Sequence, residues 1–262
     1  MEQKKKGRKR RQPAWVTASQ AAIVLAILAS AQIAVSQGYI NSIFLASPTQ
    51  IVQDFVYAMG SNELWPNLLV SLEEVAVGYG LSAVVGIAIG VLFVTFPKVE
   101  AVFSPFFAAV MAVPKTAIMP LLVVWFGIGF ESKVVMVLLF CMFTVLFNTV
   151  SGAKQARAEH LKVARVFRAT RAQTVFKVLI PSALPSIFTG LRVTAATAVT
   201  GVIFAEMTAA KKGAGFLLNE AQAVLNTPRL FLVVIIVTIV SVLFVGLVNL
   251  SEHLVCHNWR NV

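Results

Sequence analysis

Residues 154–185 read KQARAEHLKVARVFRATRAQTVFKVLIPSALP, and they separate two long apolar stretches of the chain. This segment is too long and too charged to be a tight turn. The chain as a whole is unusually apolar: 58% of its 262 residues are hydrophobic, 13% are charged, and the mean hydropathy is +0.83. A soluble domain is about half apolar and about a quarter charged. The composition therefore excludes a soluble domain, a disordered chain and a disulfide scaffold, and it predicts an all-α polytopic membrane protein.

Apolar stretches long enough to cross a membrane occur six times. A hydrocarbon core about 30 Å thick requires roughly 20 helical residues. The stretches are 16–36, a part of 67–96, 101–126, 132–152, 184–208 and 230–250. The second is longer than one span needs, so we expect its first turns, with Glu73 and Glu74, to lie at a membrane interface. The first also fits a cleaved signal peptide, which would leave five spans.

Lys and Arg residues gather in two places. Residues 1–14 carry seven of them and residues 154–177 carry another seven, whereas segment 37–66 has none. The exceptions on the predicted outer side are Lys211, Lys212 and Arg229. Cytoplasmic segments of membrane proteins are rich in Lys and Arg. We therefore predict a basic cytoplasmic tail at 1–14, a single transmembrane domain at 15–262, and both termini in the cytoplasm. Because both clusters flank apolar stretches, they do not indicate nucleic-acid binding.

Enzyme and cofactor motifs are absent from the sequence. It has no phosphate-binding glycine loop and no nucleophile elbow. Cys141 and Cys256 lack metal-site spacing, and His253 and His257 lie near the C-terminus, where solvated histidines are the simpler interpretation. We expect no catalytic residue, no metal and no cofactor on this chain.

The quoted segment keeps helical periodicity through Leu161, Ala164 and Phe167. We predict two short helices here, which Pro181 and Pro185 end or turn before the chain re-enters the membrane. Basic amphipathic helices can lie on anionic lipid or dock on a soluble partner, and the residues alone leave both open.

Small residues recur at every fourth position of the second span, at Gly78, Ser82, Gly86 and Gly90. In lipid, such a stripe lets another helix approach closely. We expect this close approach within one subunit rather than between subunits.

Candidates for a translocation pathway lie in the third and fifth spans. Thr194, Thr197 and Gly201 share one helix face, which suits either a wetted pathway or close helix contacts. Glu206 and Lys115 are ionisable residues at membrane depth, where such residues are functional candidates. Either could serve a gate, the two could pair, or each could snorkel to an interface.

The residues from 164 onward resemble a known family. The runs ARVFRATR at 164–171, FKVLIPSALP at 176–185 and GLR at 190–192 look like the coupling loop of ABC importer permeases of the nitrate, sulfonate, taurine and bicarbonate group. Further stretches resembling this group are SPT at 47–49, PLLVVWFGIG at 120–129, AEM at 205–207 and GAGF at 213–216. Together they preserve the order and spacing of the family.

One part of the coupling loop departs from the family pattern E-A-A-x-x-x-G. These positions hold Lys162, Val163, Ala164 and Arg168. A glycine at the last position relieves a tight turn, so we expect Arg168 either to forbid a glycine-only conformation or to require a remodelled turn. The departures bear on how an ATPase docks and on which ATPase it is.

The resemblance implies a type I ABC importer permease fold, with six transmembrane helices and cytoplasmic coupling helices in a loop at 154–183. The residues it assigns to ATPase coupling are Lys162, Val163, Ala164, Arg165, Phe167 and Arg168. The implied partners are a cytoplasmic ABC ATPase dimer that binds ATP, a second permease subunit (a homodimer is favoured), an extracytoplasmic substrate-binding protein and the lipid of a bacterial inner membrane.

The implied function is that of a permease subunit in an ATP-driven, binding-protein-dependent importer of a small anionic or organic-acid solute. The solute class rests on the resemblance alone. The substituted coupling motif keeps an alternative open, a secondary transporter or channel that works without an ATPase.

Overall fold

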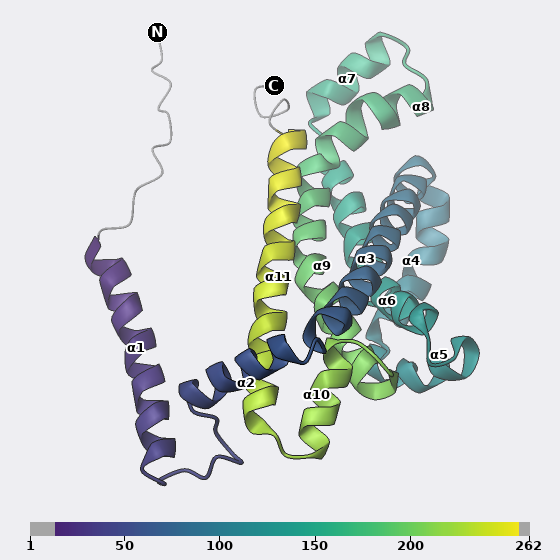
Figure 1. The fold of residues 1–262 in the computed structure, drawn as a ribbon. Helices are drawn as coiled ribbons and strands as arrows, with labels where there is room; N and C mark the ends of the chain where they lie inside the picture. The colour runs from purple at the N-terminus through teal and green to yellow at the C-terminus, as the bar shows by residue number, and fades with distance from the viewer. Residues whose placement is uncertain (1–13, 257–262) are drawn as a thin grey trace.

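The computed structural model describes residues 14–256, and every regular element in that range is a helix (Figure 1). The predicted basic tail at 1–14 lies, except for its last residue, outside the described residues. Within them, five helices are long and apolar enough to cross a membrane. They are α1 (Ala14–Ser36), α3 (Leu64–Thr95), α6 (Phe130–Lys154), α9 (Ile180–Ala209) and α11 (Thr227–Cys256).

The third predicted span is broken. α4 (Pro97–Ala112) ends before Val113 and Pro114, and a 3-10 turn (Lys115–Ile118) then leads into α5 (Met119–Phe126). Val113 is extended, with φ −68° and ψ 129°, as expected of a residue before proline. The two halves meet at 85°, and counted as one broken span they bring the number of spans among the described residues to the predicted six.

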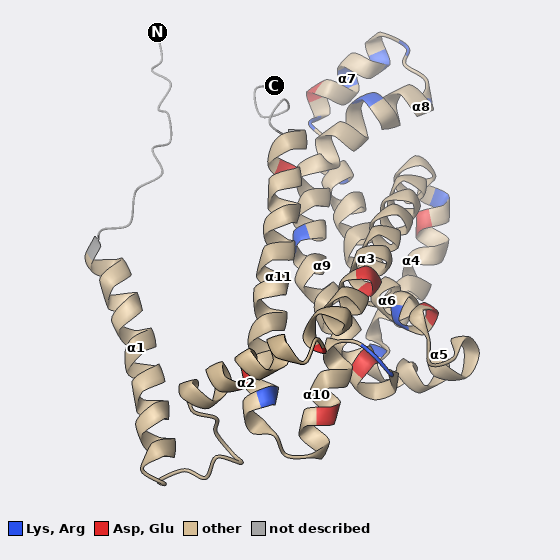
Figure 2. Cartoon of the chain, viewed as in Figure 1, with Lys and Arg blue, Asp and Glu red and all other residues tan. Residues whose placement is uncertain are grey.

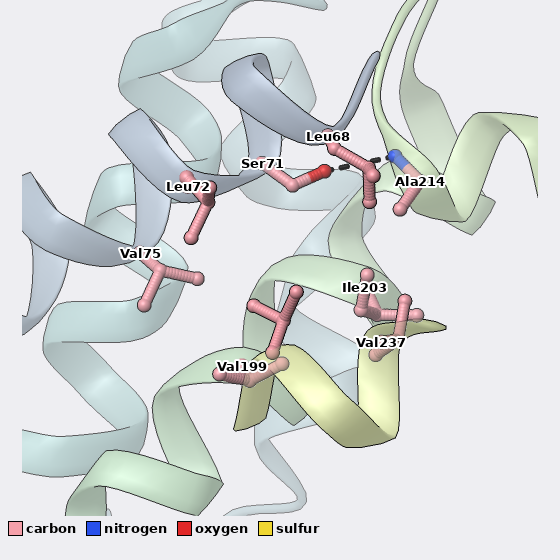
Figure 3. Close-up of a pocket in the computed structure, with 9 residues that line it drawn as sticks. Leu68, Ser71, Leu72, Val75, Val199, Ile203, Ala214 and Val237 are labelled. Carbon is pink, nitrogen blue, oxygen red and sulfur yellow. Dashed lines mark hydrogen bonds between the residues drawn. The ribbon is translucent and has the colours of Figure 1, made fainter. Parts of the chain in front are cut away.

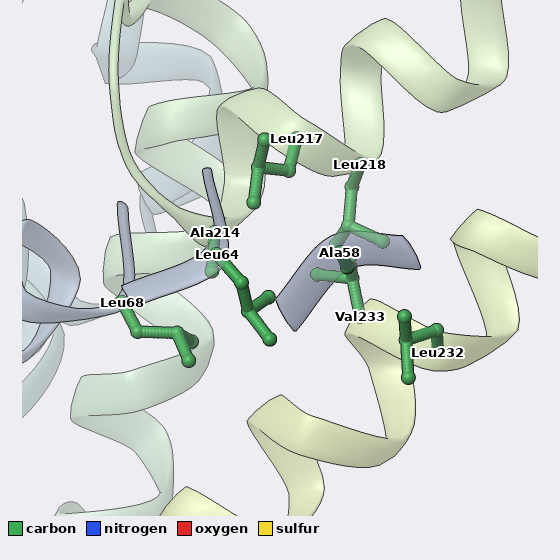
Figure 4. Packing of buried hydrophobic residues seen from close by; sticks show 8 residues of the cluster. All are labelled: Ala58, Leu64, Leu68, Ala214, Leu217, Leu218, Leu232 and Val233. Atoms are coloured by element: carbon green, nitrogen blue, oxygen red, sulfur yellow. The ribbon is translucent and has the colours of Figure 1, made fainter. Parts of the chain in front are cut away.

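Two further helices, α2 (Pro48–Gly60) and α10 (Ala214–Ala223), lie in segments expected to be outer loops. α2 starts at a capping box, in which the Ser47 hydroxyl accepts from the Gln50 N–H and the Gln50 side chain accepts from the Ser47 N–H. One apolar cluster joins α2, α3, α10 and α11 (Figure 4). Its members are Ala58, Leu64, Leu68, Ala214, Leu217, Leu218, Leu232 and Val233.

Arg229, one of the basic residues on the predicted outer side, ties three helices together. Its guanidinium donates to Glu63 Oε2 at 2.7 Å and lies 3.5 Å from Asp54 Oδ2. Glu63 precedes α3, Asp54 lies in α2, and Arg229 is in the first turn of α11. The arginine therefore has a structural role at this end of the bundle.

The small residues of α3 face α6 of the same subunit. A Cβ added to Gly78 would lie 2.6 Å from the Cβ of Val137, and one added to Gly86 would lie 2.7 Å from the carbonyl oxygen of Met142. Real side chains essentially never approach so closely, so these positions require glycine. The expectation of a close approach within one subunit is confirmed.

Two short helices, α7 (Ala158–Val166) and α8 (Arg171–Thr174), form a hairpin at the end of the bundle where α11 also ends (Figure 1). α1 stands to one side and joins the bundle through α2. Lys and Arg are concentrated in the hairpin (Figure 2). The prediction of two short helices in this polar segment is confirmed.

The prolines after α8 do not end or turn the helix, so that expectation is wrong. α8 continues through a π turn (Val175–Leu179) into α9, and Pro185 lies inside α9. Pro181 falls in the first turn of α9, directly after the π turn has changed the hydrogen-bond register. A proline there gives up only an N–H that has no regular helical acceptor. The chain therefore stays helical over Arg171–Ala209.

Candidate functional site

The α7–α8 hairpin exposes apolar side chains outside the bundle. Phe167 is 80% exposed and Val166 is 79% exposed, and Val163 is also exposed. Lys162 and Arg165 are exposed on the same helix. Large apolar side chains beside basic ones, on an element that projects from the bundle, form a surface suited to a protein partner.

Ala164 is half-buried because it faces the inside of the hairpin. A groove runs there between α7 and the segment formed by α8 and the π turn. Its lining residues are His160, Val163, Ala164, Phe167, Ala169, Gln173, Lys177 and Val178. Phe167 and Val163 thus contribute both to the groove and to the exposed apolar surface.

Arg168 ends α7 in the left-handed conformation, with φ 50°. Its N–H donates to the Arg165 carbonyl at 3.0 Å, and the Ala169 N–H donates to the Ala164 carbonyl at 2.9 Å. This bonding pattern is a Schellman helix end, where glycine is the usual residue. Arginine is accommodated because φ near 50° lies in the small left-handed region open to L-residues, at a cost of about 1–2 kcal/mol. Arg168 therefore adopts the left-handed conformation of this helix end itself, and the conformation is not one open to glycine alone.

The predicted pathway residues of α9 lie at different depths. Thr194 is buried, and its hydroxyl donates to the Gly190 carbonyl at 2.9 Å. Gly201 is buried against Phe140 of α6, whose ring would lie 3.5 Å from an added Cβ. Thr197 is half-buried. Thr194 and Gly201 thus pack against α6 of this subunit, Thr194 through its carbonyl oxygen, which accepts from Cys141 Sγ at 3.5 Å, and Gly201 through Phe140.

Lys115 lies at the bend between α4 and α5. Its Nζ is 3.5 Å from the Phe140 carbonyl oxygen and 5.5 Å from the centroid of the Phe140 ring. Glu206 makes its contacts elsewhere, so the pairing of Lys115 with Glu206 that the sequence allowed is not formed.

Glu206 is only 1% exposed and caps the start of α10. Its Oε1 accepts a hydrogen bond from the Ser71 hydroxyl and its Oε2 accepts one from the Gly215 N–H, both at 2.6 Å. The Ser71 oxygen in turn accepts from the Ala214 N–H at 2.8 Å (Figure 3). A carboxylate is favourable at a helix N-terminus, where backbone N–H groups lack partners. These contacts hold α10 on α3 and α9.

Gly213 completes this turn. Its N–H donates to Asn67 Oδ1 of α3 at 2.7 Å, and its φ is 118°, a conformation that favours glycine. A Cβ at Gly213 would also overlap the Glu206 carboxylate. The spacing between the AEM and GAGF runs is thereby explained, since the glutamate of the first run binds the backbone of the second.

Glu74 and Lys133 are site residues that the sequence analysis missed. Glu74 was expected at a membrane interface; it is 2% exposed, so it is buried within the protein. Lys133 of α6 is 4% exposed, and its Nζ lies 3.6 Å from Glu74 Oε1 and donates to the Gly129 carbonyl at 2.9 Å. The signal in the sequence is that both residues are ionisable and lie in long apolar stretches, as Glu206 and Lys115 do.

A small cavity lies beside Ser71, between α3, α9, α10 and α11 (Figure 3). The residues that line it are Leu68, Ser71, Leu72, Val75, Val199, Ile203, Ala214, Val237 and Val240. Its volume of about 20 Å³ is room for about one water molecule, and Ser71 is the one polar side chain in the lining. The cavity is too small for a solute.

The described residues offer no metal site: within 14–256, no group of three or more His, Cys, Asp or Glu side chains is placed to hold an ion. The candidate functional regions are instead the exposed surface of the hairpin at one end and the buried polar group around Glu206 at the other.

The sequence matches the model of the family described as binding-protein-dependent transport system inner membrane component over residues 82–255. The putative aliphatic sulfonates transport permease protein SsuC of Bacillus subtilis is 32% identical, over 90% of this chain and 85% of its own length. The taurine transport system permease protein TauC of Escherichia coli is 29% identical, over 82% and 80%. The nitrate import permease protein NrtB of Synechocystis is 28% identical, over 80% of each chain.

Solved structures share the fold. The MetNI methionine ABC transporter in an inward-facing conformation superposes with a TM-score of 0.65 at 21% identity, covering 73% of this chain and 95% of that chain. An amino acid ABC transporter superposes with a TM-score of 0.61 at 16% identity, covering 76% and 97%. The predicted type I importer fold is confirmed. The chain therefore belongs to the family of binding-protein-dependent transport system inner membrane components and is a permease subunit of an ABC importer of the nitrate, sulfonate and taurine group.

Proposed function

We propose that this permease forms half of the translocation pathway for a small anionic or organic-acid solute in a bacterial inner membrane. The solute class is supported by the sulfonate, taurine and nitrate permeases among its relatives. A second copy of the chain supplies the other half, and an extracytoplasmic binding protein delivers the solute. Membership of an ATP-driven family argues against the alternative of a secondary transporter or channel.

The proposed topology has one transmembrane domain over residues 15–262, with a coupling loop at 154–183 and both termini in the cytoplasm. The basic tail at 1–14 then faces the anionic inner leaflet. In support, α11 ends on the same side of the bundle as the basic α7–α8 hairpin (Figure 2).

The proposed ATPase contact is α7. One observation carries it: Phe167 is 80% exposed on a hairpin that projects from the bundle beside basic side chains. In this proposal, Phe167 and Val163 enter a groove of a cytoplasmic ABC ATPase, while Lys162, Arg165 and Arg168 meet acidic groups at its rim. ATP is bound and hydrolysed on that partner, so this chain needs no catalytic residue.

A continuous helix connects the hairpin to the membrane-spanning part of the chain. The chain is helical without interruption over Arg171–Ala209, so α8 and α9 form one continuous segment. The far end of that segment carries Glu206, which holds the start of α10. Movement of α7 on the ATPase would therefore displace α9 along its whole length, in the manner of a packed helix that shifts between two states.

The proposal assigns the predicted pathway residues two kinds of role. Thr197 and Lys115, which are only partly buried, face the pathway between the two subunits. Thr194, Gly201 and Glu206, which are buried, position α9 behind it.

A comparison of three variants tests the coupling role. Rim ion pairs contribute about 0–1 kcal/mol each, whereas truncating a buried aromatic anchor costs about 2 kcal/mol or more. Phe167→Ala should therefore weaken assembly with the ATPase more than the control Lys162→Ala does. Ala164→Asp should be worse still, because it places a charge in the half-buried groove inside the hairpin that positions Val163 and Phe167.

The readouts are co-purification of the ATPase and solute-stimulated ATP hydrolysis in reconstituted vesicles that contain the binding protein. The solutes to compare are a sulfonate, taurine and nitrate. Full assembly and full transport in both Phe167→Ala and Ala164→Asp would mean that the hairpin lies on lipid instead.

A further inference from the structure

Three ionisable side chains from three helices meet inside the membrane domain. Glu74 of α3, Lys133 of α6 and Glu206 of α9 are 2%, 4% and 1% exposed. Lys133 Nζ lies 3.6 Å from Glu74 Oε1. Ser71, one turn before Glu74 on α3, donates to Glu206 Oε1 at 2.6 Å, and this contact brings the Glu206 carboxyl group to the part of α3 that carries Glu74. They lie at the end of the bundle opposite to the hairpin, so they take no part in the ATPase contact.

Hydrogen bonds reach the two oxygens of Glu206, and an ammonium group faces one of the two oxygens of Glu74. Glu206 Oε1 and Oε2 accept from Ser71 and Gly215, and Glu74 Oε1 faces Lys133. Glu74 Oε2 is buried and has no hydrogen-bond partner. A buried polar atom without a partner costs about 1–3 kcal/mol, and more when it is charged. The site therefore lacks one donor.

The net charge of these three side chains is also uncompensated. Two carboxylates and one ammonium group leave a net charge of −1 in a site that water barely reaches. The other charged side chains near this end of α3, α6 and α9 and in α10 or the loop before it are exposed, namely Glu63, Glu73, Glu131, Lys211, Lys212 and Glu220. The buried Arg229 of α11 is already paired with Glu63 and Asp54. None of them compensates the charge from within the bundle. Burying an uncompensated charge is strongly unfavourable.

One bound proton would supply both missing elements. A protonated carboxyl group carries one O–H donor, and it brings the net charge of the group to zero. Adjacent buried carboxylates avoid being ionised together. A metal ion fits less well, because the Lys133 ammonium already faces the site and the described residues provide only two carboxylates there.

We infer that Glu74 and Glu206 form a one-proton binding site, in which Glu74 carries the proton and donates it in a hydrogen bond to the Glu206 carboxylate. The positions of the hydrogen-bond donors indicate which of the two carboxyl groups carries the proton. The Ser71 O–H and the Gly215 N–H both bond to Glu206 and favour its ionised form, whereas Glu74 has the unpaired oxygen. The proton thereby ties α3 to α9 at the point where Glu206 caps α10.

Infrared spectroscopy of the purified full-length protein in lipid nanodiscs tests the site directly. At neutral pH the wild type should show the carbonyl stretch of a protonated carboxyl group, shifted in D₂O. The band should be lost in Glu74→Gln and kept in Glu73→Gln, the matched control on the exposed face of the same helix. Absence of the band from the wild type would overturn the inference, and so would its persistence in Glu74→Gln.

Thermal unfolding provides a second, independent readout. Glu74→Gln supplies N–H donors without charge, so it should unfold at or above the wild-type temperature at neutral pH. Raising the pH removes the proton and leaves two adjacent carboxylates, so the wild type and Glu73→Gln should lose several degrees that Glu74→Gln retains. Glu206→Gln should unfold at a lower temperature at every pH. The carboxylate accepts the Ser71 O–H and the Gly215 N–H on two separate oxygens, whereas a glutamine amide has only one oxygen acceptor. Equal unfolding temperatures of Glu74→Gln and Glu206→Gln would contradict the proton site. It would also be contradicted if sodium chloride at fixed pH raised the unfolding temperature of the wild type but not that of Glu74→Gln.

Discussion

The carboxylate of Glu206 caps a helix that begins eight residues after it, since its Oε2 accepts a hydrogen bond of 2.6 Å from the Gly215 N–H. The last turn of α9 is thereby bound to the first turn of α10. Between them, Gly213 passes so close to the carboxylate that a side chain would overlap it. The tight loop at 210–213 thus depends on one buried acid and one glycine.

Gly213→Ala should release this loop. Alanine at φ 118° is strained by about 1–3 kcal/mol, and its Cβ would also overlap the Glu206 carboxylate. The matched control is Gly38→Ala, where φ is also positive (76°) but no atom lies within 4 Å of the added Cβ. The purified Gly213→Ala variant should unfold at a clearly lower temperature than Gly38→Ala. Equal unfolding temperatures would show that the contact with Glu206 does not constrain the loop.

The contact between α3 and α6 gives a second prediction, for a helix face rather than a loop. Gly86→Leu would push the two helices apart, because even a Cβ would lie 2.7 Å from the Met142 carbonyl oxygen. Overpacking of this kind typically costs about 1–3 kcal/mol, and occasionally more. Gly80→Leu places the same side chain on the open face of α3, with no atom within 4 Å of its Cβ, and should be tolerated. Yield and unfolding temperature in detergent distinguish the two, and comparable values would contradict the close contact.

Hydropathy was sufficient to predict the spans, because a span is a property of about 20 consecutive residues. The two short helices α2 and α10 were not predicted, because no long run of consecutive apolar residues determines them. They pack against residues far away in the chain, Leu232 and Val233 of α11 for α2, and Leu64 and Leu68 of α3 for α10, in one apolar cluster. A local signal for α2 did exist in the capping box of Ser47 and Gln50.

The buried polar group could be predicted only in part. Glu206 was a candidate from its depth in the membrane, but its partners Ser71 and Glu74 lie more than 130 residues earlier in the chain. Nothing in a single sequence links such positions. The helical continuity past Pro181 was missed because it depends on a π turn, which hydrophobic periodicity does not reveal.

Membrane orientation gives a third prediction, which rests on the distribution of Lys and Arg. Gln53 of α2 and Arg171 of α8 are both exposed. Helices α2 and α8 lie toward opposite ends of the bundle (Figure 1). A cysteine at Gln53 should react with a membrane-impermeant maleimide in intact cells, and a cysteine at Arg171 should react only after the membrane is opened. The native Cys141 is buried and should give little background, whereas Cys256 lies at the predicted cytoplasmic end. The reverse pattern would invert the proposed topology.

Arg168 permits the last prediction, because two substitutions there separate backbone strain from charge. Arg168→Gly removes both the guanidinium and the left-handed strain at φ 50°, whereas Arg168→Ala removes the guanidinium and keeps the strain. If Arg168 is an adaptation to one ATPase, both variants should reduce ATPase co-purification and solute-stimulated ATP hydrolysis by a similar factor, about five-fold or less for a rim contact of about 1 kcal/mol.

Hydrogen exchange of the backbone amides at the end of α7 measures the backbone strain at Arg168 separately from the effect of its charge. The Arg168 and Ala169 N–H groups form the Schellman bonds to the Arg165 and Ala164 carbonyls, so their hydrogen exchange measures how firmly the turn is closed. Exchange should be slower in Arg168→Gly than in Arg168→Ala, because glycine adopts this conformation without the cost of about 1–2 kcal/mol. Coupling that rises in Arg168→Gly above the wild type would show that the arginine is tolerated at this turn rather than used by the partner.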